Sequence, residues 1–122
     1  MKRKHRITRS IDIKRVRRLG KSYAHPFVVL TVLTSELENA RAGIVAGKTI
    51  GNAIKRNRAK RRLRAILNEF LPFFQKPTDV ILIAREPINQ AAFYDLRNAL
   101  IKLLTQAQLI DMEANDSGRS TH

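Results

Sequence analysis

A dense run of positive charge lies inside the most regular apolar pattern of the chain. Between Lys55 and Arg64 the sequence is K-R-N-R-A-K-R-R-L-R, which places seven cations within ten residues. Apolar residues recur through the same segment at helical spacing, at Ala59, Leu63, Ile66, Leu67 and Phe70. This spacing predicts a helix from Gly51 to Leu71. The fold must therefore bury one face of the helix and leave the cationic face in water.

Three apolar runs predict β-strands. Phe27–Thr34 is rich in β-branched residues, and Ala42–Lys48 follows it after a loop of hairpin-compatible length. We therefore expect these two strands to pair antiparallel. Asp79–Arg85 contains four consecutive large apolar residues, which is typical of a central strand buried on both faces. Because a helix connects Ala42–Lys48 to this strand, we expect that pair to be parallel.

Two further amphipathic helices are predicted. Residues 11–19 form the first, with Ser10 as its cap and Gly20 as its stop. The last helix follows Asn89, its expected cap, and its apolar stripe consists of Phe93, Leu96, Leu100, Leu103, Leu104 and Ala107. The expected class is α+β, with a single domain at 1–112 and a polar, flexible tail at 113–122.

The charge is concentrated in one half of the chain. The net charge is +14, and residues 1–64 hold 19 of the 24 Lys and Arg but three of the ten acids. Such a field is relieved by a polyanion, so nucleic acid is the leading partner class. The absence of cysteine excludes disulfides and fits a reducing compartment, and no apolar run is long enough to span a bilayer. We therefore expect a cytoplasmic protein without a membrane partner.

No catalytic or metal-binding constellation is visible in the sequence. His5, His25 and His122 are scattered, and the carboxylates fall singly, without metal-ligand spacing. The G-K-T at 47–49 lacks the upstream glycine of a nucleotide-binding loop. We expect no catalytic residue and no metal site in this chain.

Three alternatives to RNA recognition by the cationic helix were weighed. The face could simply be solvated, but a solvated face normally mixes both signs of charge, and this one carries no acid between Lys55 and Arg64. The helix could lie on a membrane surface, but its apolar stripe is needed by the core of the protein. A DNA-binding helix-turn-helix needs a second short helix closely before the basic one, and this chain has predicted strands at that place. A structural RNA-binding protein of the ribosomal type shares the charge and stays open as the alternative function.

The segment from Gly51 to Arg64, G-N-A-I-K-R-N-R-A-K-R-R-L-R, resembles the signature helix of the bacterial ribonuclease P protein subunit. The resemblance continues in order over about residues 6–110, through S-x-D-I-K-x-V, F-V-V-L, R-A-G-I-V-A-G-K, D-V-I-L-I-A-R and the closing leucine-rich helix. It implies a mixed four-stranded sheet in the order αβββαβα, with a left-handed βαβ crossover that contains the basic helix. General topology rules favour a right-handed one.

The resemblance also implies a division of labour. A catalytic RNA supplies the active site and its Mg²⁺, and the protein alone binds no Mg²⁺. The protein binds that RNA and the 5′ leader of precursor tRNA. No obligate protein partner is implied. The implied function is removal of the leader by this ribonucleoprotein endonuclease, a hydrolase that generates mature tRNA 5′ ends. The RNA-binding residues implied are Lys48, Asn52, Lys55, Arg56, Asn57, Arg58, Lys60, Arg61, Arg62 and Arg64.

The resemblance places the leader in a cleft between the first helix and the sheet. Three positions of this cleft, where the family commonly carries aromatic residues, are occupied here by Ile13, Arg17 and Thr31. Stacking of leader bases is worth about 1–3 kcal/mol per base in single-stranded sites. We expect aliphatic packing, hydrogen bonding or stacking on Arg17 in its place.

Overall fold

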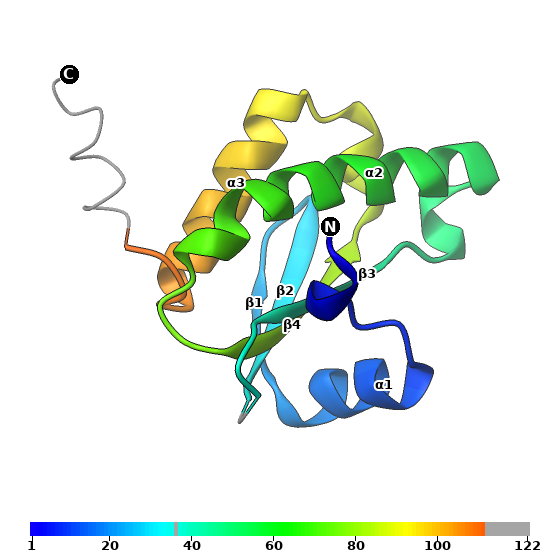
Figure 1. The fold of residues 1–122 in the computed structure, drawn as a ribbon. Helices are drawn as coiled ribbons and strands as arrows, with labels where there is room; N and C mark the ends of the chain where they lie inside the picture. Colours follow the sequence, from blue (N-terminus) through cyan, green and yellow to red (C-terminus); the bar gives the residue numbers. More distant parts are fainter. Residues whose placement is uncertain (36, 112–122) are drawn as a thin grey trace, which may run out of the picture.

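The computed structural model describes residues 1–35 and 37–111, which form a four-stranded sheet with helices on both faces (Figure 1). The helices and strands are α1 (Ser10–Leu19), β1 (Lys21–Ala24), β2 (Val28–Thr34), β3 (Arg41–Val45), α2 (Ala53–Phe70), β4 (Thr78–Ala84) and α3 (Phe93–Gln106). Four 3-10 helices complete the order, η1 (Arg3–His5), η2 (Lys48–Ile50), η3 (Leu71–Phe73) and η4 (Glu86–Gln90). The predicted α+β class and αβββαβα order are confirmed. The tail predicted at 113–122 lies outside the described residues.

The strands lie in the order β1-β2-β4-β3. β4 pairs antiparallel with β2 from Val28↔Ala84 to Thr34↔Thr78, and parallel with β3 from Arg41↔Asp79 to Val45↔Ile83. The parallel pairing is as predicted. The predicted hairpin between Phe27–Thr34 and Ala42–Lys48 is wrong, because β4 lies between the two strands. The strongly apolar β4 is almost wholly buried, so it takes the centre of the sheet, where both of its edges are paired.

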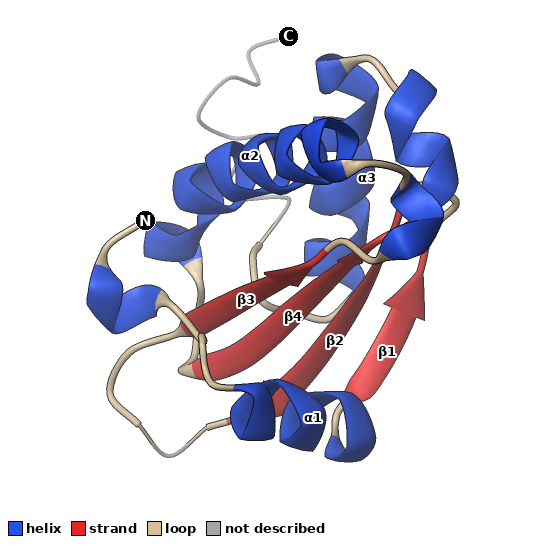
Figure 2. Ribbon diagram, turned by 90° about the vertical axis from the view of Figure 1, so that its right-hand side faces the viewer, coloured by secondary structure: helices blue, strands red, loops and turns tan. Residues whose placement is uncertain are grey.

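The connection from β3 through α2 to β4 is left-handed. With α1 in front of the sheet and the parallel strands pointing upward, β4 lies to the right of β3 and α2 lies behind the sheet (Figure 2). Most βαβ units have the opposite hand. The resemblance to the family implied this exception, and the strand pattern alone did not.

The edge strand β1 was not located from the residue pattern. Its four residues, K-S-Y-A, contain one large apolar side chain, and only that one, Tyr23, is half-buried. The strand pairs antiparallel with β2 from Lys21↔Val32 to Ala24↔Val29. A strand this short has too little alternation to be distinguished from a loop. Its position after the helix stop at Gly20 was the available signal.

The sheet separates two apolar clusters. α2 and α3 cover one face, where Leu30 and Leu82 of the sheet pack with Leu63 and Leu100 of the helices in a large core. On the other face a smaller cluster contains Ile7, Val16 and Ile81. The cationic helix is therefore held by its apolar stripe against the larger core.

Two predicted helix caps differ from the structure. α1 begins at Ser10 itself, with Arg9 as N-cap and no side-chain capping bond. α3 begins at Phe93 after Ala92, and the Asn89 side chain instead donates to the Ile50 carbonyl at 2.8 Å. The predicted stop is confirmed, since Gly20 is the C-cap of α1. A Cβ atom at Gly20 would lie 2.6 Å from the carbonyl oxygens of Val16 and Val32, so no larger residue fits there.

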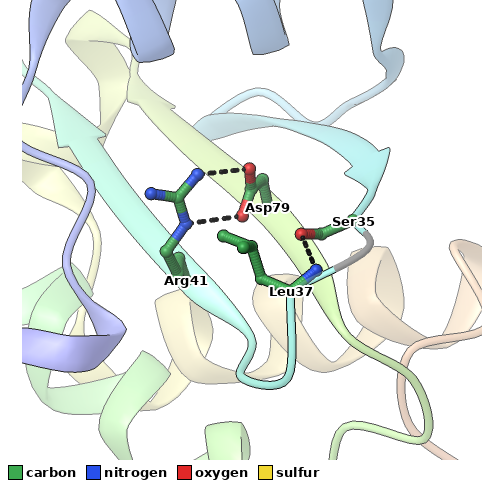
Figure 3. Close-up of polar contacts among 4 residues, drawn as sticks. All are labelled: Ser35, Leu37, Arg41 and Asp79. Atoms are coloured by element: carbon green, nitrogen blue, oxygen red, sulfur yellow. Dashed lines mark hydrogen bonds and ion pairs between the residues drawn. The ribbon is translucent and has the colours of Figure 1, made fainter.

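A buried ion pair joins the starts of β3 and β4. Arg41 Nε donates to Asp79 Oδ1 at 3.0 Å and Nη2 donates to Oδ2 at 2.7 Å, in the planar two-bonded geometry that suits a carboxylate (Figure 3). The hydrogen bond with Asp79 raises the pKa of Arg41. In the adjoining loop the Ser35 hydroxyl accepts from the Leu37 N–H at 3.0 Å. Arg41 and Asp79 are also partners in the register of β3 with β4, so the ion pair lies across the two paired strands.

Candidate nucleic-acid interface

The cationic helix α2 begins at a glycine-containing turn. Gly51 has φ 128°, a conformation that side-chain-bearing residues rarely adopt, and its carbonyl accepts from Arg56 Nε at 2.9 Å. The Asn52 side chain then accepts from the Lys55 N–H at 3.0 Å and caps the helix. Asn52, one of the predicted RNA-binding residues, thus has a definite structural role in starting the helix.

The burial of one face of α2 decides where its charges lie. Ala59, Leu63, Ile66, Leu67 and Phe70 are buried, as their spacing predicted. The ten predicted RNA-binding residues occupy η2, the start of α2 and the part of the helix that is not buried in the core. Exposed are Lys48, Asn52, Lys55, Asn57, Arg58 and Arg61; partly buried are Arg56, Lys60, Arg62 and Arg64.

The charge of this surface is strongly positive, with seven cations between Lys55 and Arg64. Asp79 forms an ion pair with Arg41 and Glu69 forms one with Arg97, and both of these arginines lie outside α2. Arg64 Nε is buried with no hydrogen-bond acceptor within residues 1–35 and 37–111. A buried donor without an acceptor costs free energy. The arrangement can bind a polyanion at several points along one helix.

Arg62 differs from its neighbours. Its guanidinium donates to the carbonyl of Ile88 at 3.1 Å and to the carbonyl of Ala91, which fastens the turn before α3 onto α2. Burial, with a smaller contribution from the nearby charge of Arg58, lowers the pKa of Arg62. Because both terminal nitrogens already contact the protein, Arg62 has less to offer RNA than the sequence pattern suggested.

The residues predicted to contact the leader are not equally accessible. Ile13 is half-buried and Arg17 is exposed, four residues apart and hence on one side of α1. Thr31 is 1% exposed, and its hydroxyl lies 2.9 Å from the Ser22 hydroxyl beneath the end of α1. The structure therefore brings Ile13 and Arg17 to the surface together and leaves Thr31 under them.

The sheet face beside α1 is only partly covered. Val29, Val45 and Ile83 point to the same face as Thr31 and Ile81 and are each partly exposed. Figure 2 shows α1 crossing one end of the sheet and leaving the rest of that face without a helix. This face offers an aliphatic surface at the side of α1 that carries Arg17.

A second cationic surface was not assigned from the sequence. The outer side of α1 carries Lys14, Arg15 and Arg18, which with Ile11 line a hollow on the protein surface. They follow Ile11 by three, four and seven residues, which places them on one face of the helix with it and was the signal available. Positive charge therefore extends to α1, outside the ten predicted residues.

The histidines of the described chain contact the backbone. His5 Nδ1 lies 2.8 Å from the Ala40 carbonyl oxygen, and His25 Nδ1 accepts from the Phe27 N–H at 3.1 Å. Burial and, to a smaller extent, the charge of Lys102 lower the pKa of His25. Within the described ranges no three His, Asp or Glu side chains cluster as metal ligands would. The described helices also include none long and apolar enough to cross a membrane.

Comparison with known proteins gives a consistent result. The family model described as ribonuclease P matches residues 1–108. The ribonuclease P protein component of Listeria innocua is 36% identical over 118 residues, covering 96% of this chain and 99% of the relative. That of Herpetosiphon aurantiacus is 37% identical over 109 residues, covering 89% of each.

Solved structures agree with the sequence matches. The RNase P protein of Staphylococcus aureus superposes with a TM-score of 0.80 at 29% identity, over 88% of this chain and 98% of that one. The RNase P protein of Thermotoga maritima superposes with a TM-score of 0.75 at 26% identity, over 83% of this chain and 96% of the other. The family-model match at residues 1–108 spans all four strands and α2, and so includes the cationic surface.

Proposed function

Because this chain belongs to the ribonuclease P protein family, we propose that it binds the RNA subunit of that enzyme along α2 and helps to hold the 5′ leader of precursor tRNA. Family membership makes the chain the protein subunit of a ribonucleoprotein endoribonuclease that acts in tRNA 5′ maturation. What remains to be assigned is the part that each surface plays.

One observation carries the proposal, namely the cationic face of α2. Arg58, Arg61 and Lys55 are exposed on a helix whose opposite side is buried in the larger core. Like charges at this spacing destabilise an isolated helix by roughly 0.2–0.5 kcal/mol per pair. RNA phosphates remove that cost and release counterions when they bind.

Catalysis is assigned to the RNA subunit, which would hold the Mg²⁺ ions. Support comes from the His5 and His25 side chains, which are engaged with the backbone and are not paired with a carboxylate. The protein then contributes binding and orientation. The chain contains no cysteine, which fits a reducing compartment, so we propose that it works in the cytoplasm.

The partly open sheet face is the surface proposed for the leader. Ile13 and Arg17 lie at its edge, and Val29 and Ile83 form part of its aliphatic floor. An extended single strand can lie on such a floor with a phosphate against Arg17. Because Thr31 is buried, contact with the leader is expected from Ile13 and Arg17 first.

Anchoring through α2 is tested by the salt dependence of binding to ribonuclease P RNA. Replacement Arg61→Gln should weaken binding and reduce the slope of log K against log salt by about 0.7–0.9, the value for one phosphate contact. The matched control is Lys102→Gln, an exposed cation of α3, which should leave the slope unchanged. Equal slopes for Arg61→Gln and the wild type would exclude a phosphate contact at that position.

The accessory role is tested by cleavage of a 5′-extended precursor tRNA at low Mg²⁺. Cleavage at the mature 5′ end should require both the RNA subunit and this chain. If the chain binds RNA but does not change cleavage, a structural RNA-binding role is the better assignment. Cleavage by the protein alone would disprove the assignment of catalysis to the RNA.

A further inference from the structure

Two adjacent aromatic side chains at the start of α3 are exposed. Phe93 is 46% and Tyr94 is 69% exposed, whereas Tyr23, Phe27 and Phe70 pack into or against the larger core. Large aromatic side chains are usually buried, so two exposed rings next to each other indicate a surface that binds a partner. The helix does not need either ring for its core contacts, which Leu96 and other residues of the apolar stripe provide.

The turn that carries these rings is fastened to the cationic helix. Arg62 donates to the carbonyls of Ile88 and Ala91, so its guanidinium lies at the residues directly before Phe93. Arg58 Nη1 reaches the Asn89 carbonyl at 3.4 Å, and Asn89 itself donates to Ile50. The turn that leads into Phe93 and Tyr94 is therefore fixed to α2 and to the segment before it.

The chemistry of this combination suits RNA. Every base has a flat face that can stack on an aromatic ring, and cations beside the ring can hold the phosphates of the same strand. The first turn of α3 also contains one acidic residue, Asp95. A second copy of this chain is a poorer partner, because it would bring the same cations, Arg58 among them, against each other.

We propose that Phe93 and Tyr94 form a stacking platform for unpaired bases of the RNA that α2 binds. The proposal rests on the proposed function, since it extends the same RNA-binding surface from α2 to the start of α3. Tyr94, as the more exposed ring, provides the main contact, and Phe93 provides the neighbouring edge. The platform lies on the α2 and α3 side of the sheet, opposite the face proposed for the leader.

The first experiment measures the dissociation constant for ribonuclease P RNA over a salt series. Tyr94→Leu keeps an apolar side chain and removes the ring, so it should weaken binding about 5- to 150-fold if one base stacks there. The salt slope should not change, because stacking releases no counterions. Tyr94→Phe should bind like the wild type, and so should Phe73→Leu, which removes a 57% exposed ring at η3, beyond the other end of α2.

The second experiment does not depend on a loss of affinity. The chain has no tryptophan, so Tyr94→Trp places a single indole on the platform. Its emission should be quenched when ribonuclease P RNA is added, and should become protected from iodide. Unchanged emission at RNA concentrations that saturate the protein would overturn the proposal.

The outcomes separate this proposal from the one on which it rests. If Tyr94→Leu and Phe93→Leu bind the RNA as the wild type does while Arg61→Gln binds more weakly, the platform is refuted and the function of α2 stands. If the wild-type chain does not bind the RNA, both fail. If the wild type dimerises in sedimentation and Tyr94→Leu is monomeric, the rings form a contact between copies and the stacking role is refuted.

Discussion

The two faces of the sheet are covered in different ways. On the α2 and α3 face the inward side chains of β2 and β4, such as Leu30 and Leu82, are fully buried in one apolar core. On the α1 face the buried residues include polar ones, Thr31 and Asp79, each held by a specific side-chain contact. The first face is closed by nonspecific apolar packing, and the second by fewer and more directional interactions (Figure 2).

This difference separates stability from access. A largely apolar core stabilises the fold roughly in proportion to buried area, and it holds α2 in place although the charge of the helix is unbalanced. The α1 face buries less, and side chains such as Val29 and Ile83 stay partly exposed and available to a ligand. Substitutions on the two faces should therefore differ in how far they lower the free energy of unfolding and in the kind of interaction that they remove.

The largest effect is expected in the core under α2. Leu63→Ala removes a fully buried side chain, so the free energy of unfolding should fall by about 2–5 kcal/mol, measured by urea denaturation. Ile54→Ala is the matched control on the same helix, because Ile54 is 78% exposed and its loss should cost no more than about 0.5 kcal/mol. Equal effects of the two substitutions would contradict the assignment of the larger core.

A smaller effect is expected from the buried ion pair. Asp79→Asn removes the charge that Arg41 contacts and should lower the free energy of unfolding by about 1.5–3 kcal/mol. Glu69→Gln tests the pair formed with Arg97 at the surface, where the change should be about 0–1 kcal/mol. If both substitutions cost the same, the α1 face is not held by the directional contact described here.

The smallest effect is expected at Thr31. Thr31→Val keeps the shape of the side chain and removes its hydrogen bond with Ser22, which should cost about 0.5–1.5 kcal/mol in thermal or urea unfolding. Thr34→Val, at the exposed end of the same strand, serves as the control. A Thr31→Val protein as stable as the wild type would show that this hydrogen bond does not contribute to holding the α1 face.

Periodicity was sufficient for the elements that carry many residues on one face. The stripe through Leu63 and Leu67 predicted α2 within two residues at its start, and the run of V-I-L-I predicted β4. Patterns with few residues were insufficient. β1 has a single half-buried apolar side chain, and the cap predicted at Asn89 was displaced by a 3-10 helix that brings its side chain to Ile50.

The candidate site was found from the sequence for a related reason. A helix with seven cations in ten residues and an apolar stripe must place the cations on the face that the stripe leaves free, and this does not depend on the rest of the chain. Which of these cations remain available to a ligand depends on distant segments. Arg62 is taken up by carbonyls more than 25 residues away, and no local pattern shows that.

The sequence by itself determined the three α-helices, the three longer strands and the sign of the surface charge, because periodicity and charge are local properties of the chain. Tertiary structure decided the strand order, since β2 and β3 are separated by a strand that comes later in the chain. It also decided that Thr31 is buried, that Phe93 and Tyr94 are exposed, and that the turn before them is tied to α2. These outcomes depend on which buried surfaces meet, and that is settled only when the whole sheet and its helices pack together.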